Sequence, residues 1–223
     1  MKKRQDRFFE KVVLLHIMDR RSFIKKSVGL VLGLSLLSLP ELASKASAAT
    51  KWGRTRFRVE ENDFWFAEEP TRRIETNRII VHHSGTTRDR DMSAAEIHRL
   101  HRDSFGWAGI GYHYVIRKNG TIERGRGWNM IGAHASGNNG DSVGICVAGN
   151  FNVGSPREAQ IRALTNLLTT LCGVYNIIPD EMGVIGHRDV NSTSCPGDML
   201  YAMLPQVRKR VMKNMGLDLP EDK

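Results

Sequence analysis

The chain has 223 residues, of which 33 are Lys or Arg and 24 are Asp or Glu, so its formal net charge is +9. Residues 1–48 alone carry +6 of this excess, so the charge of the remainder argues against a nucleic-acid-binding protein. The length suits one domain with additions, and three cysteines do not make a disulfide framework.

Residues 1–48 have the features of an N-terminal extension and an export signal. Residues 19–25 (DRRSFIK) resemble a twin-arginine signal, and an apolar run over residues 28–39 follows them. Small residues precede Ala49, where we expect cleavage. We therefore expect a periplasmic or cell-wall-associated protein without stable membrane insertion after cleavage. An uncleaved membrane anchor is the alternative, although the apolar run is shorter than the ~20 residues of a spanning helix.

Residues 49–77 are rich in Arg, Glu and aromatic residues and show no clear period. We interpret them as an extension of the mature chain that packs its aromatic side chains onto a domain of residues 78–223. Its aromatic residues are Trp52, Phe57, Phe64, Trp65 and Phe66.

The pattern of residues 78–223 alternates between strands and helices. Strands are expected at 78–83, 112–118, 121–126, 142–148 and 183–186, with a hairpin turn at Asn119-Gly120. Helices are expected from the capping box at Ser93 to about Phe105, and over residues 198–215. These elements predict an α/β fold: a single domain with a mixed central β-sheet flanked by helices.

The longest helix is expected to begin with Ser155 as N-cap, Pro156 at its first position and Glu158 at its third. Its apolar stripe has helical spacing and should face the sheet. The stripe consists of Ile161, Leu164, Leu168 and Leu171. Cys172 on this helix and Cys146 in a strand are expected to be buried free thiols, with a disulfide between them as the alternative.

A His and a Cys eight residues apart stand in a polar, loop-like segment, His187 and Cys195. Zinc accepts nitrogen and sulfur ligands, and a catalytic zinc needs three of them and an open position. The best source of a third ligand is the apolar strand that ends in His82 and His83. The pattern therefore favours a zinc site.

Six short motifs then occur in order: VHHSGT at 81–86, GIGYHY at 109–114, ERGRGWN at 123–129, GAHA at 132–135, SVGI at 142–145, and GHRD to CPG at 186–197. The set resembles the zinc amidase family that includes peptidoglycan recognition proteins and phage T7 lysozyme. The resemblance covers residues 79–201. It implies N-acetylmuramoyl-L-alanine amidase activity, Zn²⁺ as cofactor and peptidoglycan or muropeptides as partner.

The resemblance also assigns roles to single residues. It places the zinc ligands on His82, His187 and Cys195, the catalytic tyrosine on Tyr112 and a second polar catalytic residue on Thr193. Family members without activity replace the cysteine ligand, so Cys195 favours an enzyme; a non-catalytic muropeptide-binding module is the alternative. We expect a monomer that binds no nucleic acid.

Four further residues are candidate contacts to a glycopeptide: His134, Trp107, Arg126 and Trp128. Aromatic rings could stack on the ligand and Arg126 could pair with stem-peptide carboxylates. Each could instead be part of the structure around the groove. The same alternative is favoured for His98 and His101, three residues apart on a helix, and for His83, on the opposite strand face from His82.

Overall fold

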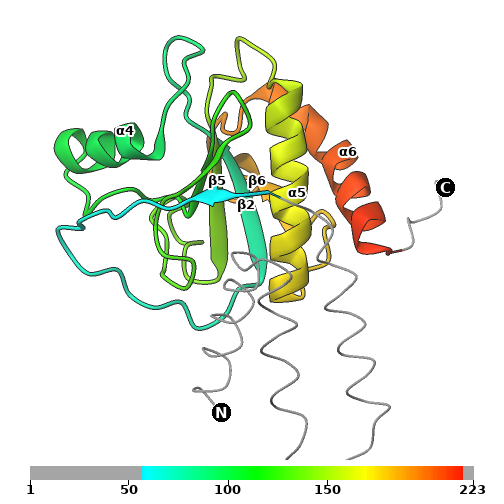
Figure 1. Ribbon diagram of the computed structural model, residues 1–223, viewed down its shortest axis with the longest axis horizontal. Helices are drawn as coiled ribbons and strands as arrows, with labels where there is room; N and C mark the ends of the chain where they lie inside the picture. The colour runs from blue at the N-terminus through cyan, green and yellow to red at the C-terminus, as the bar shows by residue number, and fades with distance from the viewer. Residues whose placement is uncertain (1–56, 218–223) are drawn as a thin grey trace, which may run out of the picture. The chain divides into compact units, whose positions relative to one another are not determined.

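A computed structural model describes residues 57–217 as a central sheet with helices on both sides (Figure 1). The sheet has six strands in the order β1-β4-β3-β5-β2-β6. Only the β3–β4 pair is antiparallel, so the sheet is mixed, and the expectation of a single α/β domain is confirmed. The strands are β1 Val59–Glu60, β2 Arg78–His83, β3 Tyr114–Ile116, β4 Ile122–Arg124, β5 Ser142–Val147 and β6 Val184–Gly186.

Helices α5 (Glu158–Tyr175) and α6 (Asp198–Met215) pack on one face of this sheet (Figure 1). The predicted stripe of α5 is buried there, with Leu164 and Leu168 fully inaccessible. The facing strand residues include Ile79, Val81, Val143, Ile145 and Val147. Burying side chains of this size stabilises the fold by about 1.5–3 kcal/mol each.

Helix α4 (Ala94–Arg99) lies on the other side of the sheet and continues as a π-helical turn, Leu100–Ser104 (Figure 1). The predicted capping box at its start is present, since Ser93 and Glu96 bond reciprocally. Ile97 of α4 packs with Val115 and Cys146 of the sheet. Because strand side chains alternate, His82 shares this face, whereas His83 points to the α5 face.

The start of α5 differs from the sequence expectation. The helix begins at Glu158 with Arg157 as N-cap, two residues later than a start at Ser155 predicts. Gln160 explains the shift: its side chain is buried, accepts from Arg157 N at 3.1 Å and donates to Ala148 O at 2.8 Å. The link to the loop after β5 fixes where the first turn forms.

The segment before β2 adds a short strand to the sheet as well as aromatic side chains that pack on the domain. Val59 and Glu60 form β1 and pair in parallel with β4. Phe64 stacks on the His98 ring with centroids 4.5 Å apart, but Trp65 is 69% exposed, contrary to the expectation for this residue. Trp52 and the predicted export signal lie outside the described residues. Within residues 57–217 no helix has the length and apolar character to cross a membrane.

Cys146 and Cys172 are buried free thiols, as predicted.

Candidate metal centre and active site

The three predicted metal ligands come together at the end of two adjacent parallel strands. His82 is the fifth residue of β2, and Val81 pairs with Gly186, the last residue of β6. His187 follows Gly186 directly, so the two imidazoles meet with ring centroids 4.5 Å apart. The possible ligand atoms of His82, His187 and Cys195 all lie within 4.8 Å of one another.

The loop that carries Cys195 is held close to β2 by hydrogen bonds. The backbone N–H of His83 donates to Cys195 Sγ at 3.4 Å, and Arg188 N donates to Cys195 O at 2.9 Å. Asp189 accepts from Gly186 N at 2.7 Å and so fixes the turn after β6. These bonds place Sγ 3.7 Å from Nδ1 of His82.

In His82 and His187, the Nε2 atom lies within hydrogen-bond distance of a neighbouring side chain. Nε2 of His82 is 3.1 Å from Nδ1 of His134, and Nε2 of His187 is 3.2 Å from Oδ1 of Asn191. The described partner of His82 Nδ1 is Cys195 Sγ, itself a predicted ligand, so the Nδ1 side of this ring faces the cluster. Sequence reasoning missed Asn191, although its position four residues after a predicted ligand was a usable signal.

Burial determines the protonation of the cluster. It holds the pKa of His82 well below its usual value, and the neighbouring His134 and His187 act in the same direction. Burial also lowers the pKa of His187 and raises the pKa of the Cys195 thiol to about 12, although the His83 N–H opposes this rise. The imidazoles are therefore neutral, as metal binding requires, and a bound cation must displace the thiol proton.

Two nitrogens and one sulfur within reach of a single ion fit zinc, which takes His and Cys ligands and keeps a fourth position open in catalytic sites. No other group of three or more His, Cys, Asp or Glu within residues 57–217 could hold a metal. The donor set is thus compatible with the predicted zinc centre.

The two residues with predicted catalytic roles lie next to this cluster. The Tyr112 ring is half-buried, with its centroid 5.1 Å from that of His82. Burial raises the pKa of Tyr112 well above its usual value, so the hydroxyl keeps its proton. Thr193 is exposed, and its Oγ1 accepts from Cys195 N at 3.2 Å.

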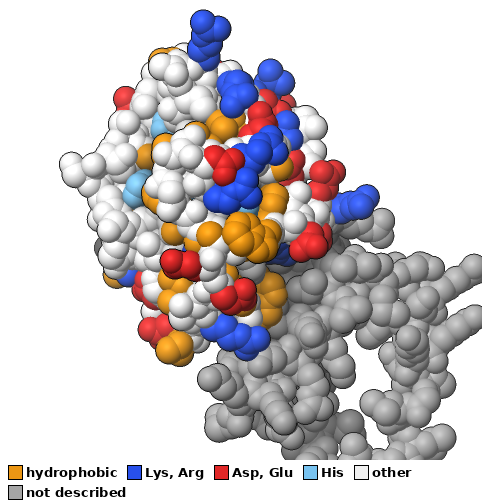
Figure 2. All heavy atoms as spheres, turned by 90° about the vertical axis from the view of Figure 1, so that its left-hand side faces the viewer, with side chains coloured by type: hydrophobic (Ala, Val, Ile, Leu, Met, Phe, Trp, Pro, Cys, Tyr) orange, Lys and Arg blue, Asp and Glu red, His pale blue; other side chains and the backbone are white. Residues whose placement is uncertain are grey.

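Trp107 is the candidate contact residue that faces solvent near Tyr112. Its side chain is 42% exposed and meets His101 edge-on at 4.7 Å, and His101 lies 5.5 Å from Tyr112. Hydrophobic side chains are exposed between charged ones on the α4 side (Figure 2). His98 and His101 form no metal pair; each accepts a backbone N–H at Nδ1, from Ile110 and Gly111 respectively.

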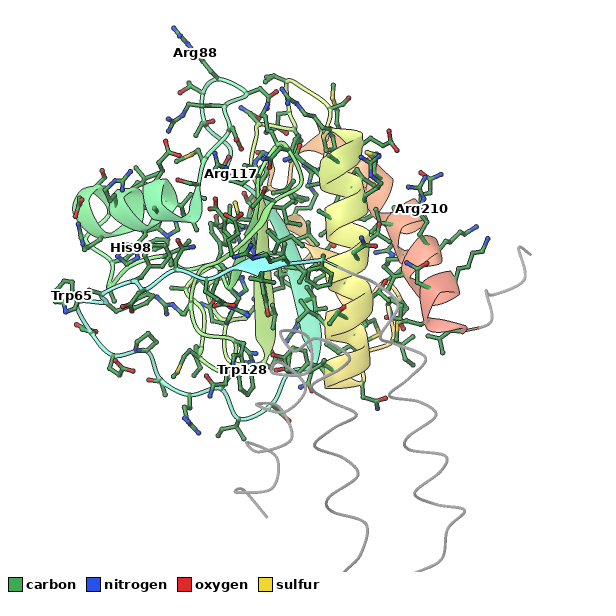
Figure 3. The ribbon with its side chains drawn as sticks, viewed as in Figure 1. Trp65, Arg88, His98, Arg117, Trp128 and Arg210 are labelled. Atoms are coloured by element: carbon green, nitrogen blue, oxygen red, sulfur yellow. The ribbon has the colours of Figure 1, made fainter. Side chains whose placement is uncertain are left out.

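The other three candidate contacts are differently placed. Arg126 is buried, and its guanidinium donates to the carbonyls of Ile110 and Ile131. Trp128 lies at the lower end of the sheet in Figure 3, where its carbonyl accepts from Arg73 and Tyr175. The cluster of predicted metal ligands lies instead where β2 ends. His134 is buried against His82. Their roles as substrate contacts stay predictions, and this placement does not favour them.

Comparison with known proteins identifies the family of the chain. The family described as N-acetylmuramoyl-L-alanine amidase (Amidase_2) matches residues 71–198. The chain is 36% identical to the endolysin of Enterobacteria phage K11 over 131 residues, which are 56% of this chain and 83% of the relative. It is 37% identical to the peptidoglycan-recognition protein SC2 of Drosophila melanogaster over 127 residues, 55% of this chain and 68% of the relative.

The solved structure of the N-acetylmuramoyl-L-alanine amidase LysC from Clostridium intestinale is similar in fold. It superposes with a TM-score of 0.61 at 32% identity, covering 73% of this chain and all of LysC. A human N-acetylmuramoyl-L-alanine amidase is 35% identical over 106 residues, 48% of this chain, but the chain spans only 18% of that protein's length.

Proposed function

Because the chain belongs to the N-acetylmuramoyl-L-alanine amidase family, we propose that it hydrolyses, with zinc, the bond between the N-acetylmuramic acid lactyl group and the stem-peptide L-alanine. The observation that carries the proposal is the cluster of His82, His187 and Cys195 with Tyr112 beside it. Peptidoglycan or muropeptides are the matching partner, and the active form is a monomer.

His82, His187 and Cys195 would hold the ion. Bound there, zinc would lower the pKa of a water molecule and polarise the scissile carbonyl, the two requirements of amide hydrolysis at neutral pH. Two neutral imidazoles and one thiolate leave the centre with about one positive charge, which favours both effects.

Tyr112 would supply a hydrogen bond that strengthens during the reaction. Its hydroxyl stays protonated, and no partner for it is found among residues 57–217, so it is free to donate to the carbonyl oxygen as negative charge develops. Donors of this kind contribute about 3–4 kcal/mol to transition-state stabilisation. Thr193, whose Oγ1 already accepts from Cys195 N, keeps its own proton for a second donation.

A non-catalytic recognition module is the second candidate, because some peptidoglycan recognition proteins bind without cleaving. The retained thiol of Cys195, 3.7 Å from His82 Nδ1, favours the enzyme. A binding module needs a surface that fits the muropeptide but has no use for a ligand set suited to catalytic zinc.

We further propose that residues 1–48 direct the chain out of the cytoplasm through the twin-arginine route, to the periplasm or the cell wall. The support is the motif at residues 19–25 with the apolar run behind it. This location would bring the enzyme to peptidoglycan.

Mass spectrometry of muropeptides incubated with the purified, zinc-loaded chain tests the amidase. Release of intact stem peptide with a free L-alanine amino group is expected, together with a glycan that has lost its peptide. Cleavage within the peptide or the glycan would refute the assigned bond. Binding without any release, in a chain that holds zinc, would establish the recognition module instead.

A further inference from the structure

The Nε2 atoms of His82 and His187 are both linked to one short loop, residues 132–139: that of His82 directly and that of His187 through Asn191. His134 of this loop contacts His82 Nε2 at 3.1 Å, and Ser136 O accepts from Asn191, whose Oδ1 is 3.2 Å from His187 Nε2. We propose that the loop braces the metal centre, with His134 as the positioning residue for His82 and Asn191 as that for His187. This inference rests on the proposed function, because it assumes that the two histidines bind zinc.

Zinc binding would determine which nitrogen of His82 carries the proton. A neutral imidazole has one donor and one acceptor, and Nδ1 must be unprotonated to bind a metal. Nδ1 is the atom that faces Cys195 Sγ, at 3.7 Å, so with the ion held by Nδ1 the hydrogen would lie on Nε2 and be donated to His134 Nδ1. The contact therefore selects the tautomer of His82 that can bind zinc.

This arrangement leaves one polar group unsatisfied. With Nδ1 as acceptor, His134 carries its proton on Nε2, which is buried and makes no hydrogen bond of normal geometry to a described residue, although the Ser142 backbone interacts with the ring and acts to raise its pKa. An unpaired buried N–H costs about 1–3 kcal/mol. A ring kept in such an orientation is better explained by what its Nδ1 does at His82 than by packing alone.

Two glycines and one asparagine fix the position of the His134 ring. The backbone N–H groups of His134 and Ala135 both donate to Asn139 Oδ1, at 2.8 and 2.9 Å. A Cβ atom added to Gly144 of β5 or to Gly132 would lie 2.4 Å from His134 Cδ2. The ring thus occupies space that exists only because both positions lack a side chain.

The burial of His134 favours a positioning role over a direct contact with substrate. His134 is 7% exposed, and its Nδ1 atom is already engaged by His82. It acts on the reaction through His82. Asn191 is partly exposed, so its bond to His187 competes with water and should contribute less.

The test compares His134→Asn with His134→Leu in the full chain, by measuring zinc affinity in competition with a chromogenic chelator. The two side chains have similar shapes, but only Asn places an acceptor near the position of Nδ1. We expect His134→Leu to weaken zinc binding about 10–100-fold, His134→Asn to restore most of it, and Asn191→Ala to cause a smaller loss than His134→Leu. Zinc affinity is a readout that does not depend on amidase activity.

His98→Leu is the matched control, since His98 is also buried and accepts a backbone N–H, but has no contact with a proposed ligand. It should lower thermal stability and leave zinc affinity unchanged. Unchanged affinity in His134→Leu would overturn the inference, as would equal losses in His134→Leu, His134→Asn and His98→Leu. A wild-type chain that binds no zinc would instead refute the zinc dependence of the proposed function, and this inference with it.

A measurement on the wild type covers the case in which His134→Leu does not fold. In nitrogen-15 NMR spectra of the zinc-loaded chain, His134 should show a bare Nδ1, which accepts from His82 Nε2, and a protonated Nε2. Observation of the opposite tautomer would overturn the inference.

Discussion

Nδ1 of His82 and Sγ of Cys195 lie 3.7 Å apart, although 113 residues separate them in the sequence. The sheet creates this proximity by placing β6 beside β2, so that the loop after β6 folds back over the end of β2. Imidazole nitrogen and thiolate sulfur are ligands that zinc accepts, and the distance between these two atoms is compatible with binding to one ion.

Cys195→Ser should abolish zinc binding while the fold persists, because serine has nearly the same volume and its hydroxyl does not ionise to a soft ligand. Metal analysis of the purified variant should find far less than one zinc per chain, and hydrolysis should be lost with it. Cys172→Ser is the control: it also removes a buried thiol, but from the far face of the sheet. Full zinc occupancy in Cys195→Ser would exclude Cys195 as a ligand.

His101 makes stability depend on pH in a predictable direction. Burial lowers its pKa from 6.5 to about 4, with Arg126 acting in the same direction. Above pH 6.5 His101 is neutral in both the folded and the unfolded chain. Between pH 6.5 and pH 4 only the unfolded chain binds a proton at His101, so the free energy of unfolding decreases as the pH falls through this window. The loss from this one residue amounts to at most about 3 kcal/mol.

Chemical denaturation of His101→Asn at pH 7 and pH 4.5 checks this sign. Asparagine keeps an acceptor for Gly111 N but does not titrate, so the difference between the two pH values should be smaller than in the wild type. Parallel losses in both proteins would show that His101 does not titrate as its burial implies.

Export can be tested apart from catalysis. A reporter fused after Ala49 should leave the cytoplasm. Arg20→Lys combined with Arg21→Lys should keep the reporter in the cytoplasm, because the twin-arginine route recognises the arginine pair. Arg4→Lys with Arg7→Lys is a control of equal charge upstream of the motif. Unchanged export of the Arg20/Arg21 variant would refute the assignment.

The sequence predicted those parts of the fold that local pattern determines. The strands at Arg78–His83 and Ser142–Val147 are apolar on both faces, and their position in the sheet follows from that. The hairpin followed from Asn119-Gly120, and the ligand set from the order of short motifs. The two-residue strand β1 has no period to detect, so only its pairing with β4 reveals it.

Other features depend on contacts that no local pattern contains. The proposed role of His134, a loop residue, depends on the space above Gly144 of β5. The carbonyl of Trp128 accepts from Arg73, in the segment before β2, at 2.6 Å, and this tryptophan lies at the lower end of the sheet (Figure 3). A motif could identify both residues, but not what they touch.

Tyr112→Phe separates catalysis from recognition. The substitution removes one hydroxyl and preserves the ring beside His82, so zinc content and muropeptide affinity should stay near the wild-type values. If the hydroxyl donates mainly in the transition state, kcat should fall by about 10²–10³ with KM little changed. Steady-state kinetics on a defined muropeptide gives both constants.

Tyr175→Phe is the matched control for this loss. It also removes a single hydroxyl, but one bonded to Arg73 and Trp128 O at the other end of the sheet. It should cost about 1 kcal/mol of stability and leave kcat unchanged. If Tyr112→Phe keeps full kcat, the hydroxyl has no part in the transition state. If neither the wild type nor Tyr112→Phe releases stem peptide with zinc bound, the chain recognises peptidoglycan without cutting it.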